Sequence, residues 1–182
     1  EMEPHFTPEE FIPVAEQSKL INRIGEWVIT TAFNQLSQWH RQFNTALTMS
    51  VNISAVQLHD SDLLPYLSHT LERLSLSANS VILEITETAL IKDNKKVTDI
   101  LRVLSGRGFK IALDDFGMGF SSVSHLMEYP IDIVKLDKSM QTSNESSDKH
   151  QRIFKALALM LKTLDFVVVA EGIETKEQLL QC

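Results

Sequence analysis

Short runs of apolar and β-branched residues recur along the chain, and each run ends beside an acid, an amide or an amine. A run of this kind, bounded by turn residues, predicts a strand that is buried on both faces of a parallel sheet covered by helices. The runs predict strands within residues 47–54, 80–87, 109–117, 131–137 and 166–174. Their starts recur roughly every thirty residues, which is typical of repeated strand–helix units. The predicted fold class is therefore α/β.

The segments between these runs have the spacing of amphipathic helices. Residues 20–43 carry apolar side chains three and four positions apart, which predicts one long helix with a single buried face. Thr7, Pro8 and Glu10 have the pattern of a capping box, so an earlier helix begins there. Further helices are predicted at roughly 61–74, 94–106, 121–128, 148–164 and 175–181.

Ionisable and amide side chains gather where the predicted strands end. In parallel α/β folds, ligands and chemistry collect at the carboxyl ends of the strands. Acids that converge there repel each other unless a cation lies among them, and a lysine inside a buried strand is costly unless it faces carboxylates. The sequence therefore predicts a metal site. The residues at these strand ends are Asn52, Glu84, Glu87, Asp114, Asp115, Lys135, Asp137, Glu171 and Glu174.

Several of these residues also have a simpler interpretation. Adjacent carboxylates point to opposite sides of a strand unless the strand is ending, so Asp114 and Asp115 could form a solvated turn before a helix cap. Glu84 and Glu87 could mark an exposed strand end. Asn52 taken alone is more often a turn residue than a ligand.

Composition narrows the possible functions. The net charge is −7 and no cluster of Lys and Arg stands out, so a nucleic-acid polymer is an unfavourable partner. The single cysteine, Cys182, allows no internal disulfide, and the longest apolar run, Phe166–Ala170, is far too short to span a membrane. Both observations favour the cytoplasm, although an anchor outside these residues stays open. The six histidines show no metal-ligand spacing, and oxygen ligands favour Mg²⁺ or Mn²⁺ over zinc.

Six segments of the chain carry the motifs of one protein family. They are FTPEEFIPVAE (6–16), VNISAVQL (51–58), LEITETAL (83–90), ALDDFGMGFSSVSHL (112–126), IDIVKLDKSM (131–140) and VVAEGIET (168–175). Through them the chain resembles the EAL domain of bacterial cyclic di-GMP phosphodiesterases. The resemblance implies a modified TIM barrel, and hydrolysis of cyclic di-GMP to linear pGpG with two divalent cations, Mg²⁺ or Mn²⁺. This reaction belongs to the bacterial second-messenger signalling that controls biofilms.

The resemblance also implies that the barrel is incomplete in these residues. Residues 1–182 are expected to be a single EAL-type fragment, the middle portion of the domain. The first strand, which bears the Glu-Ala-Leu motif, and the closing strands would lie outside it. The fragment alone is therefore expected to be inactive, and the intact protein active.

Position by position, the resemblance assigns roles to the residues at the strand ends. Glu87 corresponds to the acid that anchors the loop from Asp115 to about Ser122. Lys135, with Glu171, corresponds to the catalytic pair, the lysine orienting the attacking water. Lys19 stands where the family often ends a helix with glycine, and a left-handed conformation there would cost about 1 kcal/mol. Family metal ligands correspond to Asn52, Glu84, Asp114, Asp115 and Glu171, and motif acids of less defined role to Asp137 and Glu174.

Other functions remain open at the level of the sequence. One alternative is an inactive EAL domain that acts as a cyclic di-GMP receptor or as a protein-interaction module. Another, from the residues alone, is a different metal-dependent barrel such as an enolase-like enzyme, although adjacent aspartates before a Gly-x-Gly loop fit it poorly. The resemblance further implies a homodimer and a GGDEF or sensory domain upstream.

Overall fold

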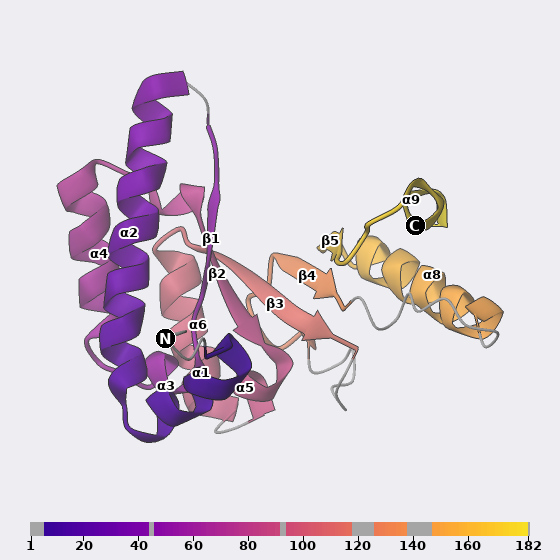
Figure 1. The fold of residues 1–182 in the computed structure, drawn as a ribbon, viewed down its shortest axis with the longest axis horizontal. Helices are drawn as coiled ribbons and strands as arrows, with labels where there is room; N and C mark the ends of the chain where they lie inside the picture. Colours follow the sequence, from indigo (N-terminus) through magenta and orange to yellow (C-terminus); the bar gives the residue numbers. More distant parts are fainter. Residues whose placement is uncertain (1–5, 44–45, 92–93, 118–125, 138–146, 182) are drawn as a thin grey trace, which may run out of the picture.

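Parallel strands form the centre of the structure, a computed structural model that describes residues 6–43, 46–91, 94–117, 126–137 and 147–181. Within these residues the strands are β1 (Met49–Asn52), β2 (Val81–Thr86), β3 (Lys110–Phe116), β4 (Ile133–Leu136) and β5 (Val167–Ala170). Each strand pairs in parallel with the next one in the sequence, so the sheet has the order β1-β2-β3-β4-β5 (Figure 1). This arrangement confirms the predicted α/β class and the position of every predicted strand.

The helices also lie close to their predicted positions. The first helix begins as expected, because the Glu10 carboxylate accepts a hydrogen bond of 2.8 Å from the Thr7 backbone N–H. The predicted helix at 121–128 lies almost entirely outside the described residues. The helices are α1 (Pro8–Gln17), α2 (Leu20–Phe43), α3 (Ala55–Leu58), α4 (Leu63–Leu74), α5 (Glu87–Ile91), α6 (Asn94–Gly106), α8 (Ser147–Thr163) and α9 (Lys176–Gln181), with a 3₁₀ turn at Ala78–Ser80.

Two short helices were not predicted. Helix α3 directly follows β1, and α5 directly follows β2. Neither is long enough to show helical periodicity, but α3 does carry a capping signal. Ser54 and Gln57 form a capping box, in which the Gln57 side chain accepts from the Ser54 N–H at 3.1 Å. A serine followed three residues later by glutamine could therefore have identified α3.

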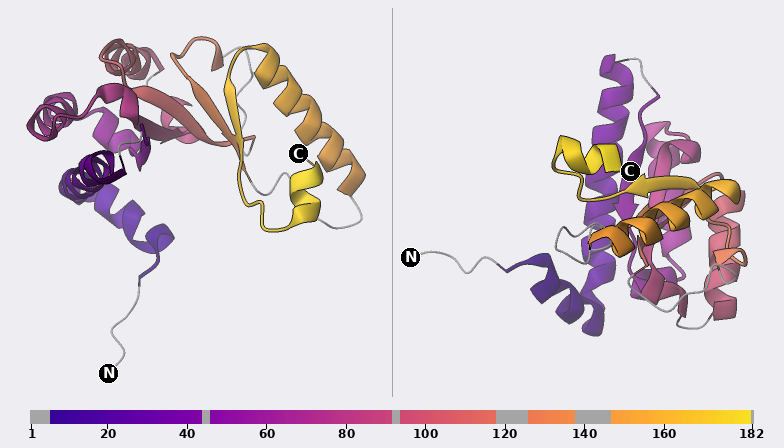
Figure 2. Two further views of the ribbon diagram at one scale, coloured as in Figure 1. Left: turned by 90° about the horizontal axis from the view of Figure 1, so that it is seen from above. Right: turned by 90° about the vertical axis from the view of Figure 1, so that its right-hand side faces the viewer.

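The helices cover one face of the sheet. Helices α2, α4 and α6 lie together beside β1, β2 and β3 (Figure 1), and α8 packs against β5 (Figure 2). The core between the helices and the sheet is apolar. Among the described residues, no helix is both long and apolar enough to cross a membrane. Fully buried side chains in this layer include Phe33, Leu36, Leu67, Leu83, Ile85, Leu101, Leu104, Ile111 and Leu113.

The prediction that every strand is buried on both faces was wrong for the two edge strands. In β1, Val51 is buried whereas Ser50 and Asn52 are exposed. In β5, Val167 and Val169 are 59% and 39% exposed. A continuous valine run fits a strand covered on both sides equally well, so the sequence could not reveal that the described helices cover only one face.

The backbone confirms the expectation for Lys19, which has a φ of 58° between α1 and α2. Ser75 and Asp165, which follow α4 and α8, also have positive φ values of 54° and 64°. Three helices thus end on a left-handed residue that is not glycine, at a modest conformational cost each.

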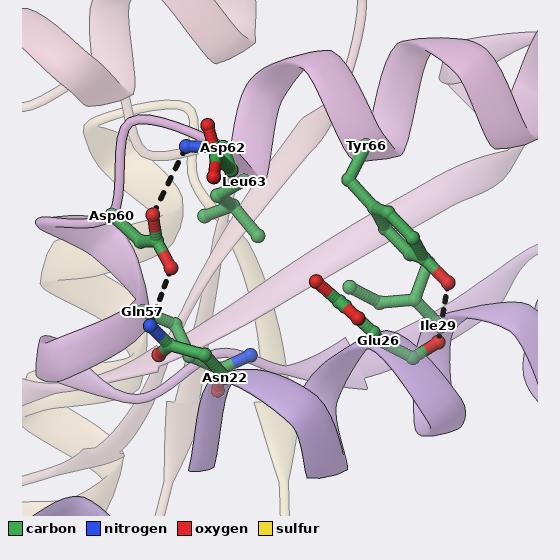
Figure 3. A pocket seen from close by; sticks show the side chains of 8 residues that line it. All are labelled: Asn22, Glu26, Ile29, Gln57, Asp60, Asp62, Leu63 and Tyr66. Atoms are coloured by element: carbon green, nitrogen blue, oxygen red, sulfur yellow. Dashed lines mark hydrogen bonds between the residues drawn. The ribbon is translucent and has the colours of Figure 1, made fainter. Parts of the chain in front are cut away.

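Polar contacts hold helix α2 against α4 and against the connection between α3 and α4 (Figure 3). The Asn22 amide donates to the Asp60 carboxylate, and the Tyr66 hydroxyl donates to the Glu26 carbonyl oxygen at 3.0 Å. Gly25 allows a close approach: a Cβ at this position would lie 1.8 Å from Nε2 of the buried Gln57. Because α3 follows β1, these contacts help to fix the end of the strand that carries Asn52.

Candidate metal centre

A bulge in β3 brings two neighbouring acids to the same rim of the sheet. Leu113 pairs with Val134 and Phe116 pairs with Leu136, so Asp114 and Asp115 together lie opposite the single residue Lys135. Asp115 has a φ of 55°, a left-handed conformation that Asp tolerates better than most residues. The strict alternation of a regular strand is therefore interrupted at the point where it would separate the two carboxylates.

Lys135 on β4 contacts three acids that come from β2, from β3 and from the end of β5. Its ammonium donates to Glu84 on β2 at 3.0 Å, to Asp114 on β3 at 2.9 Å and to Glu171, directly after β5, at 2.7 Å. The Lys135 side chain is 14% exposed. A lysine ammonium has three N–H donors, and these contacts use one for each carboxylate. The expectation that a strand lysine must face carboxylates is confirmed.

The cluster changes the protonation of its members. Desolvation alone would lower the pKa of Lys135, but hydrogen bonds from its ammonium to Glu171, Asp114 and Glu84 raise this pKa well above its ordinary value. Lys135 is therefore a permanent cation at neutral pH and cannot ligate a metal.

Asp115 experiences the opposite environment. Partial desolvation raises the pKa of Asp115, repulsion from Asp114, Asp137 and Glu171 raises it further, and Lys135 lowers it. The Asp115 residue is exposed, so the neighbouring acids affect this pKa more than desolvation does. This part of the site carries more negative charge than Lys135 balances.

The donor set fits a hard divalent cation. Carboxylate oxygens of Asp114, Asp115 and Glu171 all lie within 4.8 Å of one another. Oxygen-only ligands are those that Mg²⁺ and Mn²⁺ prefer, and the surplus negative charge would favour a cation at this position. The acids at the ends of β3 and β5 could thus bind a metal.

The remaining predicted residues lie around this cluster. Asn52 is exposed at the end of β1 and in register with Glu84 of β2. Asp137 directly follows β4 and is half-buried. Glu87 is buried as the first residue of α5, so it does not mark an exposed strand end. Most of the loop that it was predicted to anchor lies outside the described residues.

Glu174 has a local structural role that the sequence did not indicate. Its side chain is exposed, and its backbone N–H donates to the Gln178 side chain at 2.6 Å, just before α9. Thr175 completes this cap by accepting from the Gln178 N–H at 3.2 Å. A role of Glu174 in the site stays a prediction.

Two hollows elsewhere share no lining residue with the cluster. The larger, of about 430 Å³, lies between the α3–α4 connection and α6, with Leu58, Ile100 and Val103 in its wall. The smaller, of about 20 Å³, lies beside Asn22, whose buried Oδ1 has no hydrogen-bond partner among the described residues (Figure 3). Sequence reasoning had singled out neither.

Comparisons with known proteins agree with this geometry. An uncharacterized signaling protein of Caulobacter vibrioides is 41% identical over 95% of the chain and 21% of its own length. The cyclic di-GMP phosphodiesterase PA2567 of Pseudomonas aeruginosa is 35% identical over 94% of the chain and 29% of its own length. The chain thus spans less than a third of either relative.

The solved structures identify the fold. The structure of the PaMucR phosphodiesterase in complex with c-di-GMP superposes with a TM-score of 0.89 at 34% identity, covering 97% of this chain and 71% of that one. This likeness confirms the predicted fold, an α/β barrel of the TIM type. The model of the EAL domain matches residues 3–181. The chain therefore belongs to the EAL domain family.

Proposed function

We propose that the intact protein hydrolyses one phosphodiester bond of cyclic di-GMP, giving linear pGpG, and that it uses two divalent cations, Mg²⁺ or Mn²⁺. The observation that carries the proposal is the contact of Lys135 with Glu84, Asp114 and Glu171, next to Asp115. This arrangement gathers one lysine and four acids at one rim of the sheet, as a metal-dependent hydrolytic site requires.

The donor geometry supports specific roles for these residues. Asp114, Asp115 and Glu171 would hold one cation, and we assign Asn52 and Glu84 to the ligand set because they are in register at the adjoining strand ends. Bound cations would lower the pKa of a water nucleophile and stabilise charge that develops on the phosphate. Lys135, as a fixed cation, would donate to and orient the attacking water rather than accept its proton.

The bulged backbone supports the precision that such a site needs. Two carboxylates that emerge from consecutive residues of a paired strand have little freedom to move apart. Glu84 is 9% exposed and its contact with Lys135 holds it toward the other acids. The catalytic groups are thus placed by strands rather than by a free loop.

The test is turnover of cyclic di-GMP by the full-length protein with Mg²⁺ or Mn²⁺, followed by chromatography of the products. We expect pGpG from the wild type and a loss of at least about a hundredfold in Asp114→Asn. The matched control is Asp132→Asn. Asp132 also binds a lysine, Lys110, at 2.6 Å, but it lies at the other end of the sheet, before β4. This variant should retain most of the turnover.

Binding of cyclic di-GMP without turnover by the wild type would instead identify a receptor. A phosphodiesterase with full activity in Asp114→Asn would contradict the assigned metal ligands. Because the chain spans only part of its relatives, we further propose that the intact protein carries a GGDEF or sensory domain and acts as a cytoplasmic homodimer. Sedimentation of the full-length protein tests the last of these.

A further inference from the structure

The Lys135 ammonium and a divalent cation require the same carboxylates. The Asp114 and Glu171 carboxylates accept from the Lys135 ammonium at 2.9 and 2.7 Å, and both residues also belong to the set that could hold a metal. The Asp114 oxygen that accepts from Lys135 additionally accepts from the Asp115 N–H at 3.1 Å. A metal that binds through these same oxygens therefore competes with the ammonium for them.

We propose that Lys135 is a built-in competitor of the metal: its ammonium holds Glu84, Asp114 and Glu171 together as an internal cation, and metal binding displaces it from Asp114 and Glu171. The proposal rests on the proposed function, because it concerns the same site, but it adds a role that precedes catalysis. Lys135 would preserve the folded site before loading and would weaken the affinity for the metal.

The physical reason for the first effect is burial. The side chains of Glu84 and Asp114 are only 11% and 15% exposed. Carboxylates so placed are costly without a partner, because neither water nor another cation compensates for their desolvation. Removing the ammonium should therefore destabilise the protein when no metal is supplied.

The reason for the second effect is charge. A divalent cation that enters the cluster approaches a fixed positive charge at hydrogen-bond distance from its own ligands. Without this charge, the same ligands attract the cation more strongly. Loss of Lys135 should thus lower the stability of the metal-free protein and raise its affinity for the metal. These two changes have opposite signs.

A purely structural lysine predicts a different result. If Lys135 only kept the ligands in place, its removal would disorder them, and the stability and the metal affinity would both fall. A fall in stability together with a rise in metal affinity therefore distinguishes a competitor from a purely structural lysine, without a measurement of turnover.

The experiment uses the full-length protein, treated with EDTA and dialysed, and Mn²⁺ alone as the probe. Calorimetric titration of Lys135→Met should give a Kd about tenfold lower than the wild type, or lower still. Thermal unfolding in EDTA should show a reduced Tm, and Mn²⁺ should raise this Tm more than it raises that of the wild type. Lys110→Met, which removes the lysine at the opposite end of β3, should leave the Kd for Mn²⁺ unchanged.

Unchanged or weaker Mn²⁺ binding by Lys135→Met overturns the proposal. If this variant folds only when Mn²⁺ is present, the proposal is supported. If Lys135→Met does not fold at all, Lys135→Arg is measured instead. This variant keeps the positive charge, so it must bind Mn²⁺ no more tightly than the wild type. Tighter binding overturns the proposal. An inactive wild type that still shows the opposite signs refutes the phosphodiesterase function alone.

Discussion

At the scale of single residues, the site depends on how charge is distributed between neighbours. Lys135 faces three acids and is strongly cationic, while Asp115 faces mainly other acids at the exposed side of the cluster. The sequence showed that these residues lie at strand ends. It could not show which acid pairs with the lysine, because this depends on the bulge that places Asp114 and Asp115 together opposite Lys135.

Asp115→Asn should stabilise the metal-free protein at neutral pH. The pKa of Asp115 is raised in the folded state, so its ionisation costs stability as the pH rises from the ordinary value of 3.8 through the raised pKa. Asparagine removes this cost, keeps the shape and also tolerates a positive φ. Thermal unfolding in EDTA should give a higher Tm for the variant at pH 7, and the difference should vanish near pH 4 and below.

Asp165→Asn is the matched control for this substitution. Asp165 is also an exposed aspartate with a left-handed backbone, and it lies after α8. Its substitution should leave the Tm unchanged across the pH range. A gain in Asp115→Asn that is the same at pH 4 and pH 7 would show that the effect does not come from ionisation. Mn²⁺ binding should weaken only in Asp115→Asn.

At the scale of elements, the long periodic helices were predicted, whereas the two helices that directly follow β1 and β2 were missed. Helix α2 occupies the predicted residues 20–43, because its apolar spacing continues over many turns. Helices α3 and α5 have only one turn or little more, and their position depends on contacts with the rest of the fold. The contact between Gly25 of α2 and Gln57 of α3 is such a case.

Gly25→Ala should destabilise the protein by about 1–2 kcal/mol, because the new Cβ would displace the buried Gln57 side chain and break the cap of α3. Urea denaturation measures this loss. Gly106→Ala is the control, since a Cβ at Gly106 meets no atom within 4 Å. That variant should be unchanged or more stable by up to about 1 kcal/mol. Equal stabilities of the two variants would contradict the packing argument.

At the scale of the whole molecule, the two faces of the sheet have different roles, one in packing and one in the candidate site. One face carries the apolar core against the helices, and the other presents Asn52, Glu84, Asp114 and Lys135. The regular alternation of runs and helices predicted strand–helix units, whereas the sequential strand order agrees with the TIM-type barrel that only the resemblance implied. The exposure of the edge strands could not be predicted, since a valine run such as Val167–Val169 does not reveal which of its faces is covered.

Asn52→Ala should reduce metal binding without reducing stability. Asn52 is exposed on the edge strand β1, so its truncation should change the free energy of unfolding by no more than about 0.5 kcal/mol. Asn52 is a proposed ligand in register with Glu84, so its loss should nevertheless weaken Mn²⁺ binding in a calorimetric titration of the full-length protein. Ser50→Ala, two residues earlier on the same exposed face, should affect neither quantity. Unchanged Mn²⁺ affinity in Asn52→Ala would remove this residue from the ligand set.

The bulge in β3 also has a consequence for the gene, because it makes one codon dispensable for folding. Without Asp115, Phe116 would follow Asp114 directly and still pair with Leu136, so its buried side chain would keep its place in the core. Deletion of the neighbouring Ala112 codon would instead invert the pleat upstream of Asp114. In a library of single-codon deletions, loss of residue 115 should give soluble, inactive protein, and loss of residue 112 should give insoluble protein.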